Sequence, residues 1–201
     1  GAAALHARGA RVVGLDLHPS EDGDVPVLAC DVRSQASVDA AVADAIARLG
    51  GGLDALVNCA GIGIPQSAGT RPDDGALAVI DVNLLGPWRV TAAALDALRA
   101  SRGRVVNVSS GLAFLTLPFA TAYCMSKRGL VAYSDALRAE HGDAITVTTV
   151  YPGYIRTPIH EASAAQGVSL EGAVPPERLQ DAAGTLVRAV LGPPARDLAT
   201  T

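Results

Sequence analysis

Short apolar runs alternate along the chain with longer segments in which apolar residues recur every three or four positions. The runs are brief and rich in β-branched residues, which favours strands over helices. Four of them predict strands at residues 11–16, 53–57, 104–108 and 144–150, and a weaker run predicts a final strand at 196–200.

The segments between the runs predict helices because their apolar positions would share one helical face. Ser34 is suited to cap the first helix, glycines at 50–52 to end it, and Gly86-Pro87 to bend the second. Pro176 is expected in the first turn of the last helix. The predicted helices cover residues 34–49, 73–100, 119–140 and 176–191.

Near-continuous apolar strands separated by helices are typical of a parallel sheet covered on both faces. The sequence therefore predicts a single α/β domain over residues 1–201, a doubly wound, Rossmann-like, three-layer fold. Residues 1–8 resemble the tail of a helix with Gly9 as its C-cap. A doubly wound sheet places its first strand centrally. We expect that strand and a glycine-rich turn, absent from residues 1–201, to precede Gly1 in a longer natural protein.

The composition narrows the possible functions. Hydrophobic residues make up 49% of the chain and aromatic residues only 3%, so Ala, Val, Leu and Ile must form the core. A net charge of -4 without a basic cluster argues against a nucleic-acid partner, and no apolar run reaches the roughly 18 residues that span a membrane. Three distant cysteines without metal-ligand spacing indicate a reducing, cytoplasmic setting and no metal site.

Lys127 is the single lysine among 16 lysines and arginines, and it follows Tyr123 by four residues. An ammonium is a compact point charge, whereas a guanidinium is a broad planar fork, so position 127 is predicted to require an ammonium. The alternative is an ordinary surface lysine. At this spacing both side chains share a helix face, and a nearby cation is expected to favour the tyrosine phenolate. The pair thus predicts a tyrosine that exchanges protons.

Three polar turns follow predicted strands at their carboxyl ends, where ligands bind in open parallel sheets. Ser110 ends the run 104–108, Asn58 to Gly61 follow the run 53–57, and Pro152-Gly153 follow the run 144–150. Each alone is an ordinary turn. Together they predict a ligand site along one edge of the sheet.

With these motifs the chain resembles the short-chain dehydrogenase/reductase family from its start to at least Thr157. Two departures stand out: Cys59 replaces a second asparagine after Asn58, and the glycine-rich turn is absent. The motifs that carry the resemblance are Asp16, Asp31-Val32, Asn58-x-Ala60-Gly61, Asn83, Ser110, Tyr123-x-x-x-Lys127, and Pro152-Gly153 followed by Thr157.

The resemblance implies an NAD(P)-dependent oxidoreductase that interconverts a secondary alcohol and a ketone, with Tyr123 as general acid and base. Ser110 would hold the substrate oxygen, Lys127 the nicotinamide ribose, and Asn83 a water linked to Lys127. The alternative for Asn83 is a helix asparagine that only bonds backbone and kinks the helix. The implied catalytic set is Asn83, Ser110, Tyr123 and Lys127; the implied cofactor contacts are Asp16, Asp31, Val32, Asn58, Ala60, Gly61, Tyr123, Lys127, Pro152, Gly153, Ile155 and Thr157.

Asp16 favours NAD as the cofactor. A carboxylate at the end of this strand accepts hydrogen bonds from the ribose hydroxyls of NAD and repels the extra phosphate of NADP. The next residue is Leu17 rather than an arginine, so no adjacent cation would attract that phosphate.

The substrate is expected to be a small molecule with an apolar skeleton, and residues 156–173 to close over it. The resemblance implies a homodimer or homotetramer built on the helices at 73–100 and 119–140. A non-catalytic dinucleotide-binding or scaffold protein of the same fold is the alternative. The residues expected to face the substrate are Ile62, Ile64, Gly111, Leu112, Phe114, Tyr154, Ile159 and His160.

Overall fold

The computed structural model describes residues 1–20, 23–155 and 176–200 and contains two parallel sheets. The smaller sheet pairs β1 with β2, and the larger has the order β3-β4-β5-β6. The predicted α/β class with parallel strands is confirmed. The strands are β1 (Gly14–Asp16), β2 (Val27–Ala29), β3 (Ala55–Asn58), β4 (Arg104–Val108), β5 (Thr146–Tyr151) and β6 (Asp197–Ala199).

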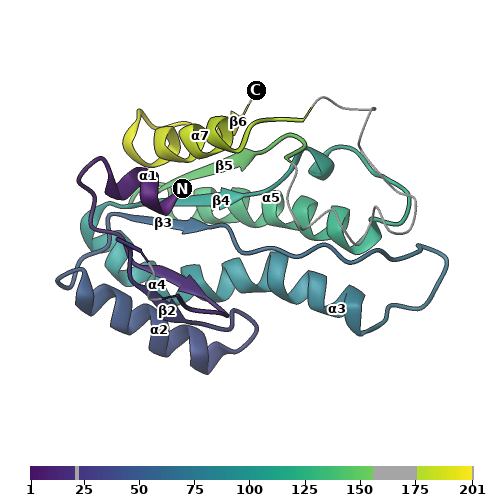
Figure 1. Cartoon of the computed structure of the whole chain (residues 1–201), viewed down its shortest axis with the longest axis horizontal. Coiled ribbons are helices and arrows are strands. Elements are labelled where there is room, and N and C mark those ends of the chain that lie inside the picture. Colours follow the sequence, from purple (N-terminus) through teal and green to yellow (C-terminus); the bar gives the residue numbers. More distant parts are fainter. Residues whose placement is uncertain (21–22, 156–175, 201) are drawn as a thin grey trace.

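Helices cover both faces of the strands (Figure 1). Helices α1 and α7 pack against each other on one side, while α2 and α4 pack together on the other, beside α3 and α5. The helices are α1 (Ala2–His6), α2 (Gln35–Arg48), α3 (Asp74–Ile80), the π-helical turn η1 (Asp81–Leu85), α4 (Gly86–Ser101), the 3-10 turn η2 (Gly111–Ala113), α5 (Thr121–His141) and α7 (Leu179–Leu191).

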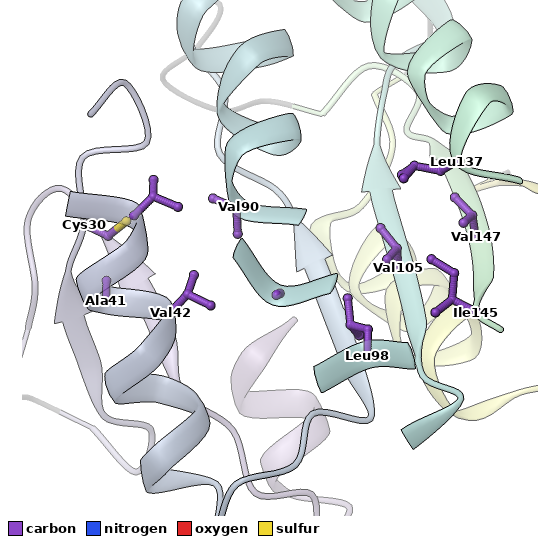
Figure 2. Packing of buried hydrophobic residues seen from close by; sticks show 11 residues of the cluster. Cys30, Ala41, Val42, Val90, Leu98, Val105, Leu137, Ile145 and Val147 are labelled. Atoms are coloured by element: carbon purple, nitrogen blue, oxygen red, sulfur yellow. The ribbon is translucent and has the colours of Figure 1, made fainter. Parts of the chain in front are cut away.

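The sheet is divided between β1 and β3, the place where the doubly wound order calls for a further strand. One apolar cluster nevertheless spans the division. Leu15 of β1 and Leu56 of β3 both pack against buried residues that include Val42 of α2, Val90 of α4 and Val105 of β4, the last three shown in Figure 2. Helices α2 and α4 therefore connect the two sheets through this cluster.

Local sequence signals explain several helix ends. The Ser34 hydroxyl accepts a hydrogen bond from the Ser37 amide at 3.3 Å, as an N-cap does, and Gly50 and Gly51 end α2 with φ near +88° and +89°. The π-helical turn η1 interrupts the predicted helix directly before Gly86, next to the position where a bend is expected. A π-helical turn of this kind often marks a functional position.

Four sequence predictions are corrected. Strand β2 was not predicted, because a three-residue run after Pro26 carries almost no periodic signal. The run 11–16 forms a strand only from Gly14, and α1 ends in Ala7 as C-cap, with Gly9 at φ +86° two residues further on. Helix α7 begins at Leu179 rather than in the turn of Pro176, because the preceding residues pair with residues 154–155.

The predicted substrate segment, residues 156–173, lies outside the described residues. Among the helices that are described, none combines the length and the hydropathy that crossing a membrane requires.

Candidate active site

Consecutive residues at the end of β4 form hydrogen bonds with α5. Asn107 donates a hydrogen bond to the Ser134 hydroxyl at 2.9 Å, and the Ser109 hydroxyl donates to the Lys127 carbonyl oxygen at 3.0 Å. The Lys127 ammonium in turn donates to the Val108 carbonyl oxygen at 2.9 Å. These five residues, here called the β4–α5 seam, fix the position of the residue that follows them in the loop after β4 relative to α5.

That next residue is Ser110, whose side chain lies close enough to the Tyr123 phenol to lower its pKa. The Ser110 hydroxyl also accepts a hydrogen bond from the Leu112 amide at 3.2 Å and so caps η2. The structure therefore brings Ser110 and Tyr123 together at the carboxyl edge of the sheet, as their positions in the sequence predict.

Lys127 is a buried cation, only 4% exposed, so the alternative of an ordinary surface lysine is wrong. Burial lowers its pKa to about 8, while a charge interaction with Cys59 opposes that change. The ammonium lies 5.8 Å from the centre of the Tyr123 ring. Lysine, phenol and the Ser110 hydroxyl thus form one continuous group.

The pKa of Tyr123 moves in the direction opposite to the one expected from a neighbouring cation. Burial raises the pKa of Tyr123 above its ordinary value and outweighs the hydrogen bond from Ser110, which lowers it. The geometry explains this outcome. The ammonium turns to the Val108 carbonyl oxygen and lies over the face of the Tyr123 ring, rather than against the phenol oxygen.

Asn83 lies in the π-helical turn η1 and is fully buried. Its side-chain oxygen accepts from the Ile62 amide at 2.8 Å, and its nitrogen donates to the Ile62 carbonyl oxygen at 2.9 Å and to the Ser126 hydroxyl at 3.2 Å. Both amide protons are therefore used within the protein. The side chain holds the loop after β3 against α5.

The loop after β3 approaches Lys127 at Gly61. A methyl group on Gly61 would lie 3.5 Å from the Asn83 side-chain oxygen and 3.6 Å from the Lys127 ammonium. Ala60 and Cys59 in the same loop are exposed. Gly61 thus leaves one side of the ammonium uncovered by side chain.

Asn58, a predicted cofactor contact, makes side-chain hydrogen bonds within the protein. Its buried amide nitrogen donates to the Thr91 hydroxyl at 3.0 Å and to the Asn107 side-chain oxygen at 2.9 Å. The side chain points into the interior and connects β3 to α4 and β4. Its role in this structure is to hold three elements together.

The other end of the predicted cofactor site is formed by β1 and the turn after β2. Asp16 is the last residue of β1, and its exposed carboxylate accepts a hydrogen bond from the His18 amide at 2.9 Å. Asp31 forms an ion pair with Arg33 at 2.8 Å, and hydrogen bonds from Arg33 lower its pKa to about 2. Asp31 is therefore a carboxylate near neutral pH.

Val32 packs against the first turn of α4. A methyl group on Gly86 would lie 2.9 Å from Val32 Cγ2, and the Val32 carbonyl oxygen accepts from the Arg89 guanidinium at 3.2 Å. Gly86 is therefore needed for a close approach, and Val32 is held in place by α4.

The turn after β5 is tied to its neighbours. The Pro152 carbonyl oxygen accepts from the Gly111 amide at 3.2 Å, and the Gly153 amide donates to the Glu177 carboxylate at 2.9 Å. Ile155 forms a parallel bridge with Glu177. Thr157, Ile159 and His160 lie outside the described residues. Sequence reasoning missed Glu177, because nothing local connects an acid 24 residues away to Gly153.

The apolar residues expected to face the substrate differ in their exposure. Ile62 packs in the same cluster as Tyr123, and Phe114 is 64% exposed with its ring 5.1 Å from that of Tyr151. Ile64 is exposed as well. Tyr154, expected to face the substrate, is instead buried.

Comparison with known proteins agrees with this geometry. A family model described as short chain dehydrogenase matches residues 3–167. Retinol dehydrogenase 16 of Homo sapiens is 43% identical over 112 residues, which are 54% of this chain and 34% of that protein. Oxidoreductase UcpA of Escherichia coli (strain K12) is 36% identical over 163 residues, which are 75% of this chain and 62% of that protein. The chain thus spans between about one third and about three fifths of these relatives.

Solved structures share the fold. An aldohexose dehydrogenase of Thermoplasma acidophilum, in ligand-free form, superimposes with a TM-score of 0.85 at 23% identity over 98% of this chain and 85% of that one. A short-chain dehydrogenase from Streptomyces avermitilis gives a TM-score of 0.82 at 24% identity over 98% of this chain and 82% of that one. Because the matching family model covers more than half of the chain, the protein belongs to the short-chain dehydrogenase family.

Proposed function

We propose that the protein is an NAD-dependent oxidoreductase that interconverts a secondary alcohol and a ketone on an apolar skeleton. The observation that carries this proposal is the group formed by Ser110, Tyr123 and the buried Lys127 at the carboxyl edge of the sheet. A buried ammonium opposes folding unless it is paired, and such groups gather at functional sites.

A bound nicotinamide would supply the hydride acceptor or donor. Tyr123 takes the proton of the alcohol during oxidation and returns it to the carbonyl oxygen during reduction. The Ser110 hydroxyl, which lies beside the phenol, holds the substrate oxygen as its charge changes. The positive charge that an oxidised nicotinamide brings would favour the phenolate.

The described residues suit a dinucleotide at Lys127 and at Asp16. Within the described part of the chain, the Lys127 ammonium donates one hydrogen bond, to Val108, so N–H groups remain for ribose hydroxyls. The Asp16 carboxylate is exposed at the end of β1 and supports NAD over NADP. Asp31, Val32, Ala60, Gly61, Pro152, Gly153, Ile155 and Thr157 stay proposed cofactor contacts on the strength of the family resemblance.

The free cysteines Cys30, Cys59 and Cys124 are compatible with a reducing, cytoplasmic setting. We also propose a homodimer or homotetramer formed through the helices α3 to α5, because large apolar side chains are exposed there. These are Leu77, Trp88 and Met125.

The main alternative is a protein that binds a dinucleotide without catalysis. Two measurements on the same sample separate the alternatives: NADH fluorescence on binding, and NADH formation from NAD with a panel of secondary alcohols. We expect both binding and turnover. Binding without turnover across the panel would favour the non-catalytic alternative, and the absence of binding would contradict both.

A further inference from the structure

Gln66 is a buried glutamine whose side-chain amide has no partner. The residue is 8% exposed, and within the described part of the chain neither its side-chain nitrogen nor its oxygen makes a hydrogen bond. Buried amides are nearly always hydrogen bonded, because leaving them unpaired costs free energy. A leucine or methionine would fill a similar volume without that cost, so a glutamine here requires an explanation.

The backbone of Gln66 is firmly held, so the unpaired amide is not a property of a loose loop. The Gln66 amide nitrogen donates to the Phe119 carbonyl oxygen at 2.9 Å, and Gln66 forms a parallel bridge with Ala120. The Thr121 hydroxyl donates to the Gln66 carbonyl oxygen at 3.4 Å. These contacts join the loop after β3 to the start of α5, two residues before Tyr123.

The Gln66 side-chain amide lies beside the first turn of α3. A methyl group on Gly75 would lie 3.5 Å from the Gln66 side-chain nitrogen and 3.1 Å from Ile64. The next residue, Ala76, belongs to the apolar cluster in which Tyr123 packs. Two apolar residues near Gln66, Ile64 and Phe119, are exposed at the surface.

We propose that Gln66 recognises a second polar group of the substrate, a neutral hydroxyl remote from the carbon that is oxidised. This inference rests on the proposed function and adds the substrate class: an alcohol with an apolar skeleton and a further hydroxyl. A hydroxyl both donates and accepts, so it satisfies the nitrogen and the oxygen of the amide together. A ketone or carboxylate would pair only with the nitrogen, and the Asp73 carboxylate, 3.2 Å from the same Gly75 point, would repel an anion.

The test uses ligand binding as well as turnover. Cyclohexanol and the 1,2-, 1,3- and 1,4-cyclohexanediols are compared by calorimetry in the presence of NAD, with wild-type protein, Gln66→Leu and Gln66→Glu. We expect at least one diol to bind wild type about tenfold more tightly than cyclohexanol, and Gln66→Leu to lose that preference. Gln66→Glu, which only accepts when ionised, is expected to recover part of the preference at low pH.

A second readout guards against a purely structural role. If the amide awaits a ligand, Gln66→Leu without ligand keeps or raises the melting temperature, since an unpaired polar group is removed. A lower melting temperature, a preference for diols that survives in Gln66→Leu, or a wild type that does not distinguish the diols from cyclohexanol would overturn the proposal. Failure of the proposed redox function would look different: the diol preference in binding would persist while no NADH formed.

Discussion

The Ser109 hydroxyl donates a hydrogen bond to the backbone carbonyl oxygen of Lys127, and this contact lies one residue from Ser110 and four from Tyr123. Together with the hydrogen bond from Lys127 to Val108, this contact fixes the position of α5 along β4. The alignment of the Ser110 hydroxyl with the Tyr123 phenol therefore depends on Ser109, whose hydroxyl bonds to the Lys127 backbone rather than to either group.

Ser109→Ala is expected to lower kcat by about tenfold, because small displacements of reacting groups are costly, and to lower the free energy of unfolding by about 1 kcal/mol. The matched control is Ser101→Ala, which removes a hydroxyl bonded to Leu53 at the opposite end of the sheet. Steady-state kinetics and urea unfolding on both variants check this. Equal effects of the two substitutions on kcat would show that Ser109 has only a structural role.

Tyr123→Phe is expected to reduce turnover about a thousandfold and to leave NADH binding within a few-fold of wild type. The substitution removes the transferable proton but keeps the ring that packs in the cluster with Ile62 and Ala122. NADH fluorescence titration and steady-state assays on the same preparation check both parts. Turnover near the wild-type rate would remove Tyr123 from the chemistry.

The main elements of the fold follow from local sequence signals, but their contacts do not. The predicted strand from Arg104 to Val108 begins and ends at the same residues as β4, and Ser34 caps α2 as its position predicts. The interruption of the helix at η1 could not be placed as closely. There the Asn83 side chain binds Ile62, 21 residues away, and no local pattern encodes that contact.

In the candidate site, too, local sequence signals identify the residues but not their contacts. The spacing of Tyr123 and Lys127 predicts a shared helix face, and both lie together. Whether the ammonium turns to the phenol oxygen or to a strand carbonyl is decided by Val108 on β4, 19 residues away in sequence. The direction of Asn58 likewise depends on Thr91 and Asn107, 33 and 49 residues distant. Motifs identify such residues but not the partners that fix their roles.

The buried ammonium of Lys127 makes stability depend on pH in a defined direction. Burial lowers its pKa from 10.5 to about 8. Below about pH 8 the group is charged whether the chain is folded or unfolded, and its burial opposes folding. Between about pH 8 and 10.5 the folded chain holds the neutral amine while the unfolded chain still binds the proton, so this contribution to stability rises with pH.

Lys127→Met is therefore expected to raise the free energy of unfolding at pH 7, by on the order of 3 kcal/mol. Its advantage over wild type should shrink between pH 8 and 10.5. Urea unfolding of both proteins across this range measures the difference. Lys127→Arg keeps a charge and should show no such gain, while its turnover falls because a planar fork replaces the point charge. A difference that stays constant with pH would contradict the titration of Lys127 in this range.

Asp16→Ser is expected to shift the ratio of kcat/KM for NADP over NAD upward by about tenfold or more, because the carboxylate that repels the extra phosphate is removed. Kinetics with both dinucleotides check the ratio. Asp24→Ser, which removes an exposed carboxylate between β1 and β2, is the control for a general change of charge. An equal shift in both variants, or wild-type protein that uses NADP as efficiently as NAD, would contradict the role given to Asp16.

The exposed apolar residues of α3 and α4 predict self-association through this face. Leu77 in α3 and Trp88 in α4 are 59% and 56% exposed. Exposed side chains of this size are typical of interfaces, with Trp enriched in their centres. Trp88 also stacks on Tyr133 of α5 at 5.5 Å, so both helices contribute to the face.

Leu77→Glu and Trp88→Glu are each expected to convert a dimer or tetramer into a smaller species, because a carboxylate at a packed interface must lose its hydration. Size-exclusion chromatography with light scattering measures the mass. Leu191→Glu is the control, since that residue is 52% exposed at the end of α7, on the other side of the strands. A wild-type protein that is already monomeric at micromolar concentration, or dissociation by Leu191→Glu alone, would show that this face is not the one that self-associates.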